Sequence, residues 1–367
     1  MTYFLAVIGS FFITLFLTPV LVRFAKKRNL ISAPRSRDIH QKKTPRLGGI
    51  AIVISFLVVM ILLAVFASRK TTDFGFPFAV YFISIDKRLL GIILATLILS
   101  AVMIYDDLRG VPAYLKFLAQ ILVGLTLIAA GIGITYLNNP FGLAIELDKV
   151  KYPLQIGGDV YHLVLWADLL FLAWTGLLMN ATNFIDGLDG LAATLSLLGA
   201  LILVGISHKV SQPATGLMAG VLAGSIAGFL PYNLPPAKVF LGDTGSMFLG
   251  MMLAVLTVIS GGKLATLLLV FGLVILDSLY VVAKRIIRRQ NPFTTADQTH
   301  LHHRFLQAGF SHTSTLILIV AFSLMFGAAG LLLEGKIKLI MVAVLAVVSI
   351  FGFVLLDLKR VKTKVKA

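Results

Sequence analysis

Residues 89–110 read LLGIILATLILSAVMIYDDLRG, an apolar run that ends on two adjacent aspartates. A run of this length is long enough to cross a bilayer as a helix. Carboxylates beside a membrane are costly unless something compensates their charge. Asp186, Asp189 and Asp243 also lie at the ends of apolar runs. The chain is therefore predicted to be a membrane protein with an acidic cluster at one of its surfaces, where a divalent cation is the first explanation to test.

The composition restricts the class of protein and the chemistry that it can perform. Of the 367 residues, 58% are hydrophobic and 13% are charged, which is typical of proteins with several membrane spans. The chain has no cysteine, so disulfides, thiolate metal ligands and a cysteine nucleophile are excluded. The net charge of +16 comes from basic residues that cluster beside apolar spans. This placement favours contact with a membrane surface, and nucleic acid is not expected as a partner.

The pattern of apolar runs predicts an all-α polytopic membrane protein with about eleven transmembrane helices. The expected spans are 3–24, 48–67, 89–105, 113–136, 161–179, 190–206, 214–230, 246–260, 264–283, 314–333 and 337–356. Alternate loops separate by charge, because one side carries 22 of the 32 lysines and arginines. The positive-inside rule places that side in the cytoplasm, with the N-terminus outside and the C-terminus inside. The first span is not expected to be a cleaved signal, because its positive charges follow the apolar stretch.

Asp106 and Asp107 stand at the predicted cytoplasmic end of the third span. Adjacent carboxylates repel each other, and one tends to keep its proton unless a cation lies close. A metal ion or a nearby lysine would relieve the repulsion, and could tune one carboxylate as a base. The alternative is a plain turn, since Asp-Asp followed by Gly110 and Pro112 also ends a helix.

Two further motifs carry aspartates. The segment Asn180-Ala-Thr-Asn183-Phe-Ile-Asp186-Gly187-Leu-Asp189-Gly190 has no basic residue, and its amides and carboxylates suit cation coordination and recognition of a base or sugar. The segment Phe240-Leu-Gly-Asp243-Thr-Gly-Ser246 precedes a span. There Asp243 or Thr244 could simply cap the helix, and the glycine-rich helix start could equally bind a phosphate or lie near a metal.

Basic residues form two candidate anion sites. His300-Leu-His302-His303-Arg304 combines protonatable donors with a guanidinium, as a clamp for a diphosphate would. Zinc bound through His300 and His303 is a weaker alternative, because no HExxH pattern supports it. In the first cytoplasmic loop, the segment Pro45-Arg46-Leu-Gly48-Gly49 follows Lys43. With Lys43, it is a secondary candidate for contact with an anionic substrate, because Gly-Gly at a helix entrance permits close approach of a ligand. Asp168 and Asp277 lie within apolar spans and remain unassigned.

Together the four motifs resemble the polyprenyl-phosphate N-acetylhexosamine-1-phosphate transferases. The matching segments are Asp106-Asp107, Asn180 to Gly190, Phe240 to Ser246 and His300 to Arg304, in the family's order. Within the family, the Pro45-Arg46-Leu-Gly-Gly49 and His-Leu-His-His-Arg segments look like the WecA/TagO-like branch. The family's acidic motif often ends in a third aspartate, and this chain has Gly110 there. No role is therefore given to a third carboxylate.

The resemblance implies the transfer of GlcNAc-1-phosphate from UDP-GlcNAc to undecaprenyl phosphate, with release of UMP. Magnesium, or alternatively manganese, would bridge the donor diphosphate, with Asp243 as its principal ligand and Asp107 as a second. Asp106 and Asp107 would orient or deprotonate the lipid phosphate. The remaining implied roles are the metal and nucleotide pocket for Asp186, Asp189 and Asn183, diphosphate neutralisation for His300, His302, His303 and Arg304, and uridine contacts for Asn233 and Phe240.

The implied protein is one integral-membrane catalytic domain over residues 1–367 in the bacterial cytoplasmic membrane. Its active site would be formed by the cytoplasmic loops 25–47, 106–112, 180–190, 231–245 and 284–313. The product would start a lipid-linked cell-envelope polymer such as lipopolysaccharide or teichoic acid, and a homodimer is compatible with the sequence. The alternatives are a MraY-like phospho-MurNAc-pentapeptide transferase, another UDP-HexNAc donor and, more remotely, a secondary transporter.

Overall fold

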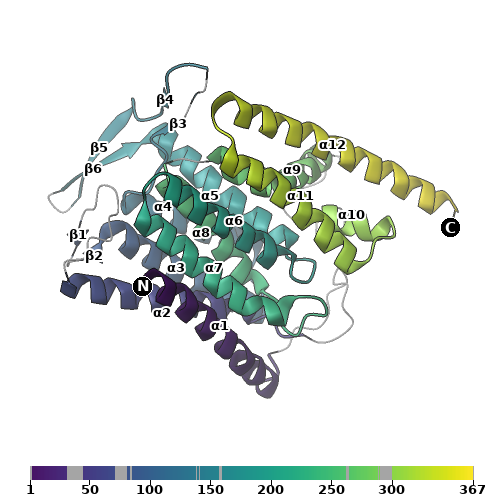
Figure 1. The fold of residues 1–367 in the computed structure, drawn as a ribbon, viewed down its shortest axis with the longest axis horizontal. Coiled ribbons are helices and arrows are strands. Elements are labelled where there is room, and N and C mark those ends of the chain that lie inside the picture. Colours follow the sequence, from purple (N-terminus) through teal and green to yellow (C-terminus); the bar gives the residue numbers. More distant parts are fainter. Residues whose placement is uncertain are drawn as a thin grey trace.

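The described part of the chain folds into a bundle of twelve helices with three short hairpins at one end (Figure 1). The computed structural model describes residues 2–30, 44–70, 81–82, 85–137, 139, 141–156, 159–261, 264–287, 289 and 300–366, and the counts below refer to these. The helices are α1 (Thr2–Lys27), α2 (Gly48–Lys70), α3 (Lys87–Arg109), α4 (Ala113–Ala129), α5 (Leu165–Ile185), α6 (Leu191–Lys209), α7 (Pro213–Asn233), α8 (Gly242–Ile259), α9 (Leu264–Ile287), α10 (Leu301–Gln307), α11 (His312–Leu332) and α12 (Gly335–Lys366).

The hairpins all belong to the connections that the sequence places on the outer side. They pair β1 (Tyr81–Phe82) with β2 (Ile85–Asp86), β3 (Tyr136–Leu137) with β4 (Ile145–Glu146), and β5 (Lys151–Ile156) with β6 (Asp159–Val164), each in antiparallel fashion. In Figure 1 they lie at the left, while α10 and the C-terminus lie at the right. The two ends of the bundle are therefore built differently.

The predicted helical membrane fold is confirmed at the level of its class. Among the described residues, ten helices are long and apolar enough to cross a bilayer, and α4 is a shorter apolar helix of 17 residues. These eleven correspond in order to the eleven predicted spans, whereas the sidedness of the termini stays a prediction. The all-α description was incomplete, because two-residue and six-residue strands form in the connections that are predicted to lie outside.

The ends of several helices differ from the predicted spans. Helix α3 continues through both aspartates to Arg109, α5 runs from Leu165 to Ile185, and α8 begins at Gly242. Backbone hydrogen bonding continues through polar residues, whereas an apolar run stops at the first charged side chain. In contrast, α4 stops at Ala129, well before the predicted end of its span at residue 136. Several residues assigned to loops thus lie on helix ends, where their side chains have defined positions.

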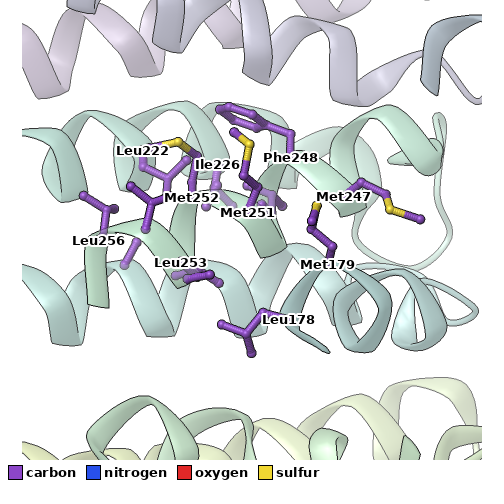
Figure 2. Packing of buried hydrophobic residues seen from close by; sticks show 14 of the residues in the cluster. Leu178, Met179, Leu222, Ile226, Met247, Phe248, Met251, Met252, Leu253 and Leu256 are labelled. Carbon is purple, nitrogen blue, oxygen red and sulfur yellow. The ribbon is translucent and has the colours of Figure 1, made fainter. Parts of the chain in front are cut away.

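Helix α8 forms the centre of the bundle, and 94% of its membrane-length window is buried. Figure 2 shows Met251, Met252 and neighbouring side chains of α8 among Leu222 and Ile226 of α7 and Leu178 of α5. Gly250 lets α8 approach the backbone of α5, because a Cβ at this position would overlap the Leu178 carbonyl. The start of α8 is thereby held in place at the end of the bundle where the polar motifs gather.

Candidate active site

The centre of the candidate site is a lysine that joins two helices. Lys116, in the first turn of α4, places its Nζ 2.5 Å from Oδ2 of Asp106 in α3 and 2.6 Å from Oδ2 of Asp243 in α8. The second Asp106 oxygen accepts a hydrogen bond from the Val111 backbone N–H at 2.7 Å. Asp106 is only 4% exposed, so the ammonium and the N–H together compensate a buried carboxylate.

Asp107 caps helix α8 from a different helix. Its Oδ1 accepts the backbone N–H of Asp243 at 2.8 Å, and its Oδ2 accepts the backbone N–H of Thr244 at 3.0 Å and the Thr244 hydroxyl at 2.7 Å. These N–H groups belong to the first turn of α8 and have no partner within the helix. The alternative in which Asp243 or Thr244 caps α8 does not hold, because the cap position is Leu241 and the side chain that caps comes from α3. Asp243 is thereby released to face Lys116.

Gly242 makes this arrangement possible. It has φ of +75°, in the left-handed region that favours glycine, and a Cβ there would lie about 3 Å from both oxygens of Asp107 and would overlap the Arg46 carbonyl. Gly49 likewise packs directly on Gly245. The glycines of the two motifs therefore allow close backbone contact between residues 46–49 and the start of α8.

Asparagines from α5 complete the polar layer beside Asp243. Asn183 donates from Nδ2 to the Ser246 hydroxyl at 2.9 Å, and its side chain also hydrogen-bonds Asp243. Asn180 and Gln120 pair through their amides, with Asn180 Nδ2 2.8 Å from Gln120 Oε1. Gln120 lies one turn after Lys116 on α4. The amide pair therefore fixes the position of α4 along α5, and with it the position of Lys116.

Asp186 lies at the end of α5 and is influenced by the same cluster. Burial raises the pKa of its carboxyl well above the ordinary value, and the charges of Asp243 and Asp107 act in the same direction. The charge of Arg46 and the backbone N–H of Gly242 oppose this rise. A carboxyl that keeps its proton can donate a hydrogen bond, so Asp186 is suited to an acceptor such as a phosphate oxygen.

Asp189 and Asn233 bind the loop between α7 and α8. Asp189 Oδ2 accepts the Ala237 N–H at 2.9 Å, and Asn233 Nδ2 donates to the Val239 carbonyl at 3.0 Å. Both side chains are buried, and the contacts described for them are with protein. Their predicted contacts with nucleotide remain predictions.

The loop also contacts the segment that precedes α2. The Phe240 N–H bonds the Pro45 carbonyl at 2.9 Å, and the Gly48 N–H bonds the Phe240 carbonyl at 3.1 Å. Phe240 and Arg46 are half-buried beside this contact. Lys43, a predicted contact of the substrate, lies outside the described residues.

The histidine motif forms the short helix α10, which contacts the loop between α5 and α6, residues 186–190, called here the acidic loop. The His302 ring is 2% exposed and lies on Gly187, where a Cβ would overlap Nε2. Its centroid is 4.2 Å from that of His303. Burial lowers the pKa of His302 well below 6.5, and the charges of His303, His300 and Arg304 lower it further. These surroundings favour the neutral ring of His302, and its predicted role in neutralising a diphosphate stays a prediction.

Arg304 is enclosed by protein. Its guanidinium forms an ion pair with Asp277 of α9 and lies 4.9 Å from the Tyr280 ring centroid and 4.8 Å from that of Phe353. The side chain is 1% exposed. The predicted contact between Arg304 and a diphosphate stays a prediction, and the contacts described here are internal.

Lys116 and Asp277 were not among the predicted site residues. Lys116 is the only charged residue of α4, and Asp277 is the only acidic residue of α9. A charge inside an apolar helix is expensive and therefore needs a partner. This signal was available in the sequence, but the partners of a lone charge follow only from the packing of distant helices.

The acidic cluster has the composition of a cation site. One carboxylate oxygen each from Asp106, Asp107 and Asp243 lie within 4.8 Å of one another. Hard oxygen ligands are those that Mg²⁺ prefers. The Lys116 ammonium already bridges two of the carboxylates, which shows that the cluster accommodates positive charge. The donor set therefore fits a divalent cation.

These features define a class: a polytopic membrane protein with a compensated acidic centre where α3, α4, α5 and α8 meet. Residues 89–261 match the family model of glycosyl transferase family 4. A Bacillus subtilis protein named as a probable undecaprenyl-phosphate N-acetylglucosaminyl 1-phosphate transferase is 29% identical, over 94% of this chain and 89% of its own. A decaprenyl-phosphate N-acetylglucosaminephosphotransferase of Mycobacterium leprae is 32% identical, over 89% and 83%.

A third relative has a different donor in its name. A phospho-N-acetylmuramoyl-pentapeptide-transferase of Staphylococcus epidermidis is 28% identical, over 89% of this chain and 98% of its own. The chain belongs to glycosyl transferase family 4. The resemblance inferred from the four motifs is thus confirmed.

Proposed function

We propose that the protein transfers GlcNAc-1-phosphate from UDP-GlcNAc to undecaprenyl phosphate and releases UMP. An oxygen of the lipid phosphate would attack the β-phosphorus of the donor, and the bond from that phosphorus to the bridging oxygen of UMP would break. The names of the Bacillus subtilis and Mycobacterium leprae relatives support the reaction class. The observation that carries the proposal is the cluster of Asp106, Asp107 and Asp243 around Lys116.

The cluster supplies what phosphoryl transfer requires. Such reactions depend on positioning and on neutralisation of charge. Asp243 and Asp107 would hold Mg²⁺, or alternatively Mn²⁺, which when bound would neutralise the donor diphosphate. Lys116 is placed to exchange a carboxylate partner for a phosphate oxygen, and Asp106 would then be free to orient or deprotonate the lipid phosphate. Asp186 would donate a hydrogen bond from its protonated carboxyl.

The histidine helix would form the other wall of the donor site. His300, His302 and His303 lie in or beside α10, whereas Asn183 lies in α5 and Phe240 in the loop before α8. We propose that the whole chain is one catalytic domain in the cytoplasmic membrane and that the site faces the cytoplasm. The excess of basic residues on that side supports this orientation.

A second candidate donor is UDP-MurNAc-pentapeptide. The Staphylococcus epidermidis relative supports it, since that protein covers 89% of this chain. A secondary transporter is less well supported, because transporter sites lie near the bilayer midplane, whereas these carboxylates lie on helix ends.

UMP release decides between these candidates. Purified protein is incubated with Mg²⁺, undecaprenyl phosphate and either UDP-GlcNAc or UDP-MurNAc-pentapeptide. Release of UMP from UDP-GlcNAc that requires the lipid supports the proposal. Release from the pentapeptide donor alone assigns the second candidate, and no release with either donor contradicts both.

The variant Asp243→Asn tests the cluster itself. Its UMP release should fall by about 100-fold or more, because the amide keeps the shape of the side chain but removes its charge. Asp148→Asn is the matched control, because Asp148 pairs only with Lys151 on an outer connection among the contacts described for it. Near-normal turnover of Asp243→Asn at saturating Mg²⁺ would remove Asp243 from the ligand role.

A further inference from the structure

Asp277 is a buried carboxylate that the reaction proposed above does not use. It lies in α9 and is 1% exposed. A carboxylate in such surroundings is costly unless hydrogen bonds and charges compensate it. All of its described partners come from the start of the histidine helix: His300 Nδ1 at 3.0 Å, the Leu301 backbone N–H at 3.0 Å, and the Arg304 guanidinium. One side chain of α9 thus holds three groups of the His-Arg motif.

The enclosure of Arg304 indicates an internal role. Both Tyr280 and Phe353 pack against its guanidinium, and Tyr280 in turn donates its hydroxyl to Asp357 at 2.8 Å. Lys284 also bonds Asp357, at 2.6 Å. The end of α12 therefore closes over the pair that Arg304 forms with Asp277. A guanidinium in this position serves to neutralise Asp277 and to attach α10 to α9 and α12.

His300 gains a defined orientation from the same carboxylate. Because an ionised carboxylate only accepts hydrogen bonds, His300 donates from Nδ1, and Nε2 is the ring nitrogen directed away from Asp277. The ring also stacks on Phe184 of α5, with centroids 5.2 Å apart. Phe184 stands two residues before Asp186. Asp277 thus sets both the tautomer of His300 and its place beside the acidic loop.

We propose that Asp277 is a positioning residue of the donor site: it neutralises Arg304 within the protein and orients His300 so that Nε2 meets the donor diphosphate. This inference rests on the proposed function. It differs from the simpler view that Arg304 itself binds the diphosphate. The two views predict different results when Asp277 and Arg304 are changed together.

Donor binding in single and double variants tests the proposal. Titration calorimetry measures the Kd of UDP-GlcNAc or UDP-MurNAc-pentapeptide, whichever the wild type binds, for Asp277→Asn, Arg304→Gln and the double variant. Each single variant should weaken donor binding by about 10-fold or more, as loss of an orienting partner does. The double variant should be no weaker than either single variant, because both changes break the same contact.

Several results would overturn the proposal. If Arg304→Gln weakens donor binding by its full factor on top of Asp277→Asn, Arg304 contacts the donor directly. An unchanged donor Kd in Asp277→Asn would leave Asp277 with a role in folding alone. Should a single variant fail to fold, the double variant still carries the test, because it leaves no unpaired buried charge; in the proposal it binds the donor about 10-fold more weakly than the wild type.

Controls separate this inference from the proposed function. Asp168→Asn, which affects a carboxylate that accepts the Val164 N–H at the other end of α5, should leave the donor Kd unchanged. For active variants, the KM for undecaprenyl phosphate should also remain unchanged. A wild-type protein that binds neither donor overturns the proposed function and this inference together, whereas normal donor binding by Asp277→Asn overturns the inference alone.

Discussion

Lys116 is the residue that most directly links charge to stability in this protein. Its ammonium contacts Asp106 and Asp243, and without it these two neighbouring carboxylates would lose the positive charge that lies between them. Lys116→Met should therefore lower the stability by about 2 kcal/mol, less than for a fully buried pair because Lys116 is 23% exposed. The measurement is thermal unfolding in detergent with a chelator present.

The addition of a divalent cation provides the control for that variant. Mg²⁺ should restore the unfolding temperature of Lys116→Met more than it raises that of the wild type, because it replaces the missing positive charge. Lys151→Met, which breaks an exposed pair with Asp148, should behave as the wild type does. Equal responses of Lys116→Met and wild type to Mg²⁺ would contradict a cation site at these carboxylates.

The buried His302 predicts a dependence of stability on pH. Since the folded protein holds the pKa of His302 below 6.5, the unfolded chain binds the proton first as the pH falls. The contribution of His302 is therefore fully present above about pH 6.5 and is lost progressively below it. His302→Gln should lose less unfolding temperature than the wild type between pH 7.5 and 5.5. The exposed His208→Gln is the control, and an identical loss in all three proteins would exclude a buried neutral His302.

Among the described helices long enough to span a membrane, α8 is the most completely buried, so a larger side chain there has little space. Gly250 lies against the Leu178 carbonyl and Met179 Cα, so the side chain of Gly250→Val has no space. The variant should be destabilised by about 1–3 kcal/mol, measured as a lower unfolding temperature in detergent. Gly352→Val on α12 is the matched control, since nothing lies within 4 Å of a Cβ there. Equal unfolding temperatures for the two variants would show that α5 and α8 are not closely packed.

The helices were predictable where apolar runs are uninterrupted, and their polar ends were not. The residues of α3 up to Tyr105 follow directly from hydropathy, but the continuation through Asp106 and Asp107 does not, because the charges are compensated by α4 and α8. The contact between Asp107 and α8 joins residues 136 positions apart, and the contact between Asp106 and Lys116 depends on how α4 packs against α3. A local reading of Asp243 accordingly suggested a helix cap, whereas the cap comes from α3.

The sequence predicted which residues belong to the candidate site better than it predicted which residues they contact. The motifs correctly brought Asp106, Asp107 and Asp243 together, since charges at the ends of spans on one side of a membrane must share a surface. The internal partner of Arg304 was not predictable, because Asp277 lies 27 residues earlier in a different helix. An arginine beside histidines looks the same in a sequence whether it faces a ligand or a buried carboxylate.

The orientation of the whole molecule can be tested with single cysteines, because the natural chain has none. Gly142→Cys, in an exposed connection that is predicted to lie outside, should react with an impermeant maleimide in intact cells. Arg28→Cys, at an exposed position directly after α1, should react only after the membrane is permeabilised. The reverse pattern would invert the predicted topology and move the acidic cluster to the outer face.

The lysine between the carboxylates also has a consequence for biogenesis. Many metal sites are assembled only when the ion arrives, so a shortage of the ion leaves the chain unfolded. Here α3, α4 and α8 are joined by a counter-ion that is part of the polypeptide. A newly inserted chain can therefore fold when divalent cations are scarce and remain folded without them. If the reaction requires the proposed Mg²⁺, scarcity of the ion would stop turnover reversibly, and the folded protein would not be exposed to proteolysis.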